Sequence, residues 1–113
     1  MSELAISMLA CAALIAGTGE AFEGSLGGPA FDAMSEAMSS AYGRQMSTAG
    51  QGGSIPLCNV LQSTFPDAEI MLYGVEEPRC LIHAPNESVD PSEIEHVALA
   101  QAMFLAGYGR APR

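Results

Sequence analysis

Hydrophobic residues recur every three or four positions in the first half of the chain, and this spacing predicts an amphipathic helix. The apolar stripe consists of Phe31, Met34, Met38 and Tyr42. Gly43 follows directly and can adopt the left-handed conformation that ends helices. We therefore expect a helix over residues 31–42 with one buried face.

A second helix is predicted near the C-terminus. Asp90-Pro91-Ser92-Glu93 has the form of a capping box with proline at the first helical position. The apolar positions that follow share one predicted face, and they are Ile94, Val97, Ala98, Ala102 and Leu105. Gly107 is expected to end this helix, and His96 falls on its polar, solvated side.

Between these helices the pattern predicts a short strand over 46–49, a helix and a second strand. Ser54 is expected to cap the helix, with Pro56 in its first turn and Leu57, Leu61 and Phe65 facing inward. Residues 69–73 are apolar and bounded by Gly74, as is typical of a buried strand. Helices alternating with strands predict the α/β class, here a partial three-layer sandwich with an incomplete sheet.

The N-terminal segment, residues 1–23, reads as an apolar leader helix followed by a glycine-rich connector. The apolar run from Leu4 to Ala16 is shorter than the roughly 20 residues that span a bilayer, so we expect no membrane helix. A secretory leader is an alternative, but the segment carries Glu3 and no basic residue. A cytoplasmic location is expected, and the apolar helix would favour self-association or a companion chain.

Charge limits the partners. The 113 residues include 13 acidic side chains against four arginines, which gives a net charge of −9. Such a chain repels nucleic-acid phosphates and anionic membranes, so we expect neither as a partner. The three cysteines, Cys11, Cys58 and Cys80, are odd in number and widely spaced, which favours reduced thiols over a disulfide framework.

A glycine-rich loop before the middle helix is the first candidate site. Gly53 and Ser54 stand at the expected helix start, where backbone N–H groups and the helix dipole favour a carboxylate or an oxyanion. No lysine follows the glycines, so this is not a nucleotide-binding loop of the Walker kind. A simple cap and tight turn is the structural alternative.

The loop over residues 80–87 is the second candidate site. His83 lies between apolar residues and a Pro-Asn-Glu turn, so its imidazole could ligate a metal, with Asn86 or Glu87 orienting it. A core histidine bonded to backbone is the alternative. Cys80 and His83 would supply only two zinc ligands. The acidic pair Glu76-Glu77 beside an arginine is interpreted as a solvated turn, and the residues alone supply no catalytic set.

Three motifs resemble the C-terminal end of the zinc-dependent metallodipeptidases related to carnosinase, carboxypeptidase G and succinyl-diaminopimelate desuccinylase. They are Gly-Gly-Ser-Ile-Pro at 52–56, Phe-Pro-Asp-Ala-Glu-Ile at 65–70 and Ile-His-Ala-Pro-Asn-Glu at 82–87. Their order and spacing match as well as their letters. The resemblance assigns residues 24–109 to the C-terminal part of a metallopeptidase catalytic domain.

The resemblance implies a hydrolase that cleaves a peptide or amide bond next to a free carboxylate with metal-activated water. His83 would be the last metal ligand, for zinc or another divalent ion such as manganese or cobalt. Gly53 and Ser54 would bind substrate, a dipeptide or an N-acyl amino acid in the full-length form, and Asn86 and Glu87 would support the histidine.

Other parts of the family pattern are missing from the sequence. It contains no His-x-Asp segment, no Glu-Glu pair ahead of a lid domain and no lid domain. Residues 1–16 do not resemble the family's preceding strand, and Gln51 departs from the residue of many relatives. The expectation is therefore a fragment that is inactive alone, with an incomplete metal site and no catalytic residue of its own. The alternative is a non-catalytic remnant or binding module that pairs with a companion chain.

Overall fold

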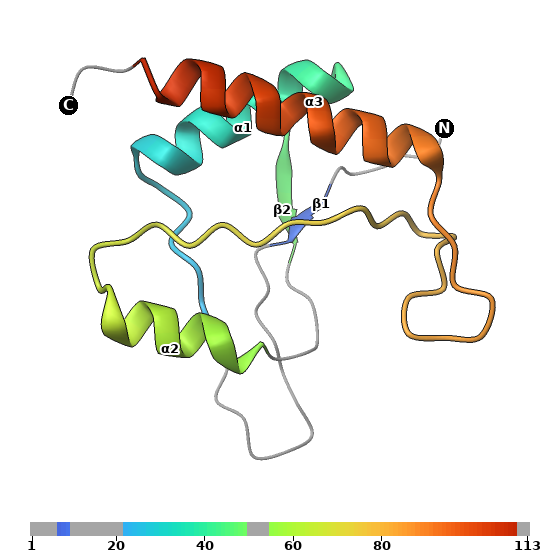
Figure 1. The fold of residues 1–113 in the computed structure, drawn as a ribbon, viewed down its shortest axis with the longest axis horizontal. Helices are drawn as coiled ribbons and strands as arrows, with labels where there is room; N and C mark the ends of the chain where they lie inside the picture. The colour runs from blue at the N-terminus through green and yellow to red at the C-terminus, as the bar shows by residue number, and fades with distance from the viewer. Residues whose placement is uncertain (1–6, 10–21, 50–54, 111–113) are drawn as a thin grey trace.

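The computed structural model describes residues 7–9, 22–49 and 55–110. Its elements, in chain order, are β1 (Ser7–Leu9), α1 (Pro29–Tyr42), β2 (Ser47–Ala49), α2 (Pro56–Thr64) and α3 (Pro91–Tyr108). Helices α1 and α3 pack together as one layer, and an extended segment runs between this layer and α2 (Figure 1). This segment, residues 69–73, links the two parts of the structure.

Helix α1 confirms the predicted stripe. Met34 and Met38 are buried, at 1% and 3% exposure, and Phe31 and Tyr42 pack against the cluster they form with Ala100. The helix ends at Gly43, which adopts the predicted left-handed conformation with φ 64° and donates its N–H to the Ser39 carbonyl.

A side chain distant in sequence caps the start of α1. Proline at position 29 has no N–H, so the first free donors are those of Ala30 and Phe31. Both donate to the Glu69 carboxylate, at 3.1 and 2.7 Å. Gly28 leaves room for this contact, because a Cβ there would lie 2.5 Å from the carboxylate and the residue has φ 122°. Glu69 thus joins the extended segment to α1 and places a negative charge at the positive end of the helix dipole.

Helix α3 begins as predicted but buries a different face. The Asp90 side chain accepts hydrogen bonds from the Ser92 N–H at 2.9 Å and the Ser92 hydroxyl at 2.8 Å, and these bonds lower the pKa of Asp90. Ala100 is fully buried against α1, and Phe104 packs beside it. The helix continues through Gly107 to Tyr108.

The predicted face of α3 was wrong at both ends, because Ile94 and Leu105 are exposed. The apolar residues of α3 are distributed around the helix, so their spacing does not predict which face is buried. Ala100 is the fully buried residue of α3, in one cluster with Met34 and Met38 of α1.

Polar groups close the α1–α3 interface near the start of α3. The Tyr42 hydroxyl donates to the Glu93 carboxylate at 2.9 Å, and the Tyr42 ring stacks on His96 with centroids 4.6 Å apart. His96 is therefore half-buried rather than solvated as expected, and its Nδ1 is buried without a hydrogen-bond partner among the described residues. Glu93 turns toward α1, which explains why it serves the interface instead of completing the capping box.

The strands form a small parallel pair. β1 pairs with β2 in the register Ser7–Ser47, Met8–Thr48 and Leu9–Ala49, so the predicted strand near 46–49 is confirmed. The apolar run expected to be a helix is a strand at Ser7–Leu9, and the rest of that run lies outside the described residues. Residues 69–73 were predicted to be a buried strand, but they are half-buried and form no strand in the described chain. The partial three-layer sandwich stays a prediction.

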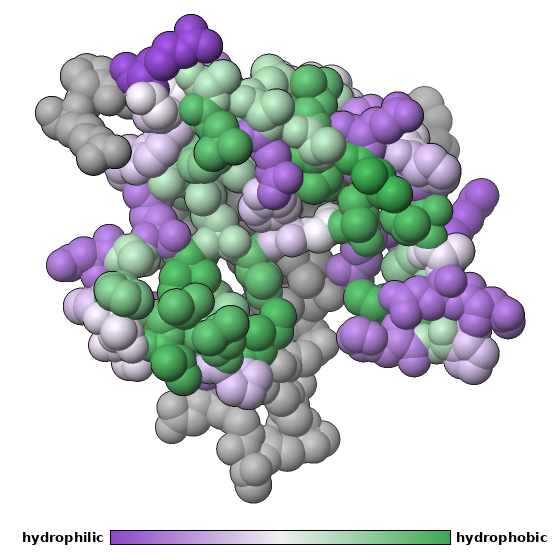
Figure 2. Space-filling model, in the orientation of Figure 1, coloured by the Kyte–Doolittle hydropathy of each residue, from purple (hydrophilic) through white to green (hydrophobic). Residues whose placement is uncertain are grey.

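Helix α2 differs most from expectation. It begins at Pro56 with Ile55 as its N-cap residue, whereas the expected cap, Ser54, lies outside the described residues. Leu57 and Phe65 were expected to face inward but are about three-fifths exposed, at 61% and 57%. The helix packs on no other helix or strand that the structure describes, and hydrophobic residues gather over it at the surface (Figure 2). The apolar side of α2 therefore has no described helix or strand to pack against.

The cap on α1 can be tested with Glu69→Gln. An amide presents one acceptor oxygen where the carboxylate presents two, so we expect a loss of about 1–2 kcal/mol in the free energy of unfolding. Urea denaturation measures it, with Glu36→Gln on the exposed side of α1 as the matched control. Equal effects of the two substitutions would show that the cap contributes nothing beyond charge.

The Tyr42–Glu93 hydrogen bond predicts a stability loss at alkaline pH. Burial, and then the hydrogen bond to Glu93, raise the pKa of Tyr42 above its usual value. The stabilisation is therefore complete below about pH 10, the usual tyrosine pKa, and is lost as pH rises further. We expect Tyr42→Phe to cost about 1 kcal/mol at pH 7 and less above pH 10, as measured by urea denaturation at each pH. Tyr108→Phe serves as the control, and a pH-independent difference would contradict the assignment.

Candidate functional site

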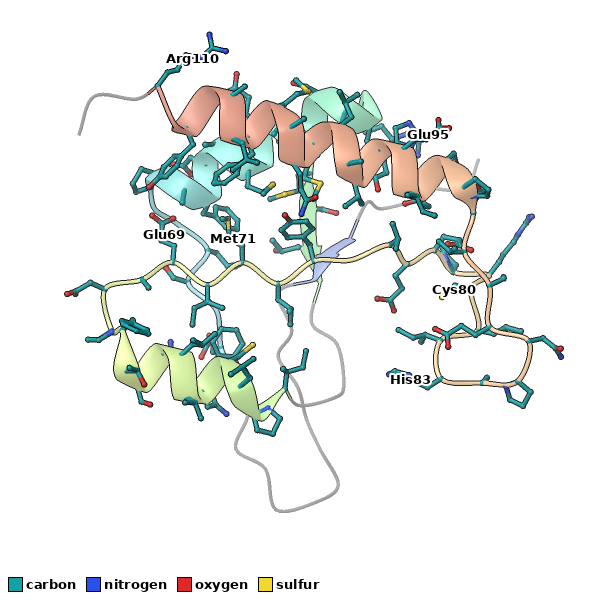
Figure 3. The ribbon with its side chains drawn as sticks, viewed as in Figure 1. Glu69, Met71, Cys80, His83, Glu95 and Arg110 are labelled. Carbon is teal, nitrogen blue, oxygen red and sulfur yellow. The ribbon has the colours of Figure 1, made fainter. Side chains whose placement is uncertain are left out.

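The histidine loop is closed by its own backbone. The Ser88 N–H donates to the Cys80 carbonyl at 2.9 Å, and inside this closure Ala84 donates to Leu81 and Glu87 to Ala84. These are two consecutive turns. Cys80 is buried and anchors the loop, while residues 81–90 are all exposed. The loop projects from the body of the molecule and carries His83 on its side (Figure 3).

Three residues of this loop adopt positive φ. Leu81, His83 and Asn86 have φ of 54°, 61° and 65°. Asparagine tolerates this left-handed region well, whereas residues with larger side chains adopt it rarely. The backbone conformation at His83 is thus imposed by the turns around it, and such conformations concentrate at functional positions.

The loop does not yet form a metal centre. His83, Asn86 and Glu87 are all exposed. Cys80 is buried while His83 faces solvent, which separates the two potential zinc ligands. Within residues 7–9, 22–49 and 55–110, no three His, Cys, Asp or Glu side chains gather in a group that could hold a metal. His83 would therefore need ligands from elsewhere.

The second candidate site, the glycine-rich loop before α2, lies largely outside the described residues. Gly53 and Ser54 are not among the described residues, so their role in substrate binding stays a prediction. Helix α2 starts two residues later, at Pro56, and its first turn carries no acidic residue. An anion near this helix start would meet no opposing carboxylate in that turn.

The acidic turn after residue 75 is less solvated than its sequence indicated. Glu77 is half-buried, and its Oε2 is buried without a hydrogen-bond partner in the described residues, while Arg79 is exposed. The carboxylate with a defined role is instead Glu69, which caps α1. Sequence reasoning missed that role, because the two partners are 38 and 39 residues apart and no local motif links them.

A groove of about 390 Å³ lies between α1 and the C-terminal half of α3. Its walls are mostly apolar, with Glu36 and Ser40 as polar groups and with Phe104 and Tyr108 stacked 5.2 Å apart on one side. The His83 loop precedes the opposite end of α3, whose 18 residues span about 27 Å. The groove and the histidine loop are therefore separate features.

The sequence is similar to that of one known protein. Over 97 residues, 85% of the chain, the sequence is 50% identical to the cysteinylglycine-S-conjugate dipeptidase of Corynebacterium striatum. The resemblance is to a dipeptidase. A stretch of this length necessarily includes the centre of the chain and both candidate sites. The chain spans about a fifth of that relative's length, 21%.

Two other comparisons found nothing: no family model and no solved structure matches the chain. The dipeptidase resemblance inferred from the three motifs is thus supported at the level of a peptidase relative. Among the described residues, no helix is long and apolar enough to cross a membrane.

The strained loop backbone can be tested by Leu81→Asn. Asparagine accepts the positive φ at residue 81 more readily than leucine does, and the leucine side chain is already half exposed. We expect the substitution to raise the free energy of unfolding by about 0.5–1 kcal/mol. The neighbouring Ile82→Asn, at a position without positive φ, is the control, and thermal or urea unfolding gives the comparison. Destabilisation by both substitutions would refute the strain argument.

Proposed function

We propose that this chain forms part of a metal-dependent dipeptidase that hydrolyses a peptide or amide bond beside a free carboxylate. The observation that carries the proposal is the 50% identity to a dipeptidase over 97 residues. The three motifs at 52–56, 65–70 and 82–87 lie in the same part of the chain and agree with it. The substrate would be a dipeptide or an N-acyl amino acid.

In this proposal His83 is one metal ligand, and the other ligands come from outside the described residues. Its exposure and projecting loop leave the imidazole accessible from outside the described structure. The ion would be zinc or another divalent metal such as manganese or cobalt, and its role would be to activate water for attack on the carbonyl. The described residues do not complete its coordination, so the chain alone should lack turnover.

Gly53 and Ser54 would bind the substrate's carboxylate or the developing oxyanion. The support is chemical, since backbone N–H groups at a helix start favour negative charge and the first turn of α2 holds no acidic side chain. Asn86 and Glu87, close to His83 in the same turns, are proposed to orient the imidazole once the site is complete.

A non-catalytic binding module is the second candidate. The exposed apolar residues of α2 favour it, because single proteins rarely leave such surfaces uncovered. Under this hypothesis the chain would associate with a companion but contribute nothing to chemistry.

A chimera distinguishes the two candidates. The matched stretch of the Corynebacterium striatum dipeptidase is replaced by the corresponding residues of this chain, and hydrolysis of a cysteinylglycine S-conjugate is measured. We expect an active, chelator-sensitive enzyme in which His83→Ala lowers kcat/KM at least 100-fold, since loss of a ligand disables the metal. Glu95→Gln, on the exposed side of α3, is the control and should change activity little.

Two outcomes would contradict parts of the proposal. A folded chimera without hydrolytic activity would favour the binding module. Full activity of the His83→Ala chimera would remove His83 from the metal site. For the 113-residue chain alone, we expect no dipeptide hydrolysis with or without added zinc.

A further inference from the structure

The backbone of the histidine loop makes two successive turns of the same kind. In the first, the Ala84 N–H donates to the Leu81 carbonyl at 2.9 Å, and in the second the Glu87 N–H donates to the Ala84 carbonyl at 3.2 Å. His83 and Asn86 are the third residues of these turns, with φ of 61° and 65°, and the second residue of each turn is without positive φ. Positive φ at the third residue alone is the pattern of a type II turn.

The amino acids suit the second turn better than the first. Type II turns favour proline at the second position and glycine or asparagine at the third. The second turn has Pro85 and Asn86 at these positions, whereas the first has Ile82 and His83. The left-handed backbone of His83 is therefore less favoured by its own turn, and it needs support from the structure around it.

Backbone hydrogen bonds supply this support. Residues 81–90 are exposed, so burial of their side chains does not hold the loop. Ala84 belongs to both turns, since its N–H closes the first and its carbonyl accepts the hydrogen bond of the second. The hydrogen bond from the Ser88 N–H to the carbonyl of buried Cys80, at 2.9 Å, encloses both turns. Because residue 86 directs the chain toward Ser88, a change of its φ would break this closure.

We propose that Asn86 is a positioning residue for His83, and that it acts through its left-handed backbone rather than through its amide group. The inference rests on the proposed function, in which His83 binds a metal, and specifies how the loop holds the imidazole in place. The turn depends on the φ of residue 86, and the Asn86 side chain is exposed. A loop whose backbone is already fixed loses less conformational entropy when its histidine is bound.

Glycine and alanine at position 86 separate a backbone role from a side-chain role. Asn86→Gly removes the amide group and still permits positive φ, whereas Asn86→Ala removes the same group and disfavours positive φ. The first measurement uses the full 113-residue chain without metal. It follows amide hydrogen exchange at Ala84, Glu87 and Ser88, whose N–H groups close the loop.

We expect exchange at these three amides to be about tenfold faster in Asn86→Ala than in Asn86→Gly, because only alanine opposes the left-handed backbone. Amides of α1, bonded within the helix, are the internal reference. Ile82→Ala is the control, since it truncates an exposed side chain of the same loop at a position without positive φ.

The second measurement uses the dipeptidase chimera described above. Zinc affinity is measured by competition with a chelator, and the KM for the cysteinylglycine S-conjugate is measured at saturating zinc. We expect Asn86→Ala to weaken zinc binding about tenfold with little change in KM, because the residue positions a ligand and does not bind substrate. Asn86→Gly should restore most of the zinc affinity.

Equal losses of zinc affinity in Asn86→Gly and Asn86→Ala would overturn the proposal, because the amide group would then be the part that acts. Unchanged exchange at Ser88 in Asn86→Ala would overturn it as well. Failure of the proposed function gives a different result, namely a chimera that binds zinc equally well with His83→Ala. In that case the exchange measurement on the metal-free chain still decides whether Asn86 fixes the loop.

Discussion

The contact between the Glu69 carboxylate and the first N–H groups of α1 determines how the described structure is organised. It supplies acceptors that Pro29 and its neighbours cannot find locally, and it ties the extended segment to the helix layer. The register of that segment follows: with Glu69 fixed, Met71 and Tyr73 must fall on the same side and meet the cluster around Met34, Met38 and Ala100. Gly28 is required because a side chain there would occupy the place of the carboxylate.

The apolar surface of the described chain is only partly covered. Within the described chain, α1 and α3 bury a small cluster, while α2 leaves Leu57, Val60 and Phe65 exposed. Figure 2 shows the hydrophobic residues over α2 as a continuous area. Within the described residues, α2 therefore has an apolar side that no other helix or strand covers.

The conformation of the histidine loop is set locally, whereas a metal site at His83 would require distant residues. Two turns and the Ser88–Cys80 closure hold three residues in the left-handed region. Among the described residues no three His, Cys, Asp or Glu side chains gather into a possible metal site, so the proposed role of His83 depends on ligands outside them. The exposed loop is compatible with the proposed role of His83 in a site that other ligands complete.

Some helix ends and caps follow from the sequence itself, because they depend on neighbours only a few residues away. The stripe from Phe31 to Tyr42, the left-handed Gly43 and the Asp90 cap were all predictable in this way. Tertiary structure decided which face α3 buries, since α3 carries apolar residues on several sides and its contacts with α1 lie around Ala100 and Phe104. It likewise decided the role of Glu69, whose partners are 38 and 39 residues distant, and the partial burial of His96 against Tyr42, because no local pattern encodes such distant contacts.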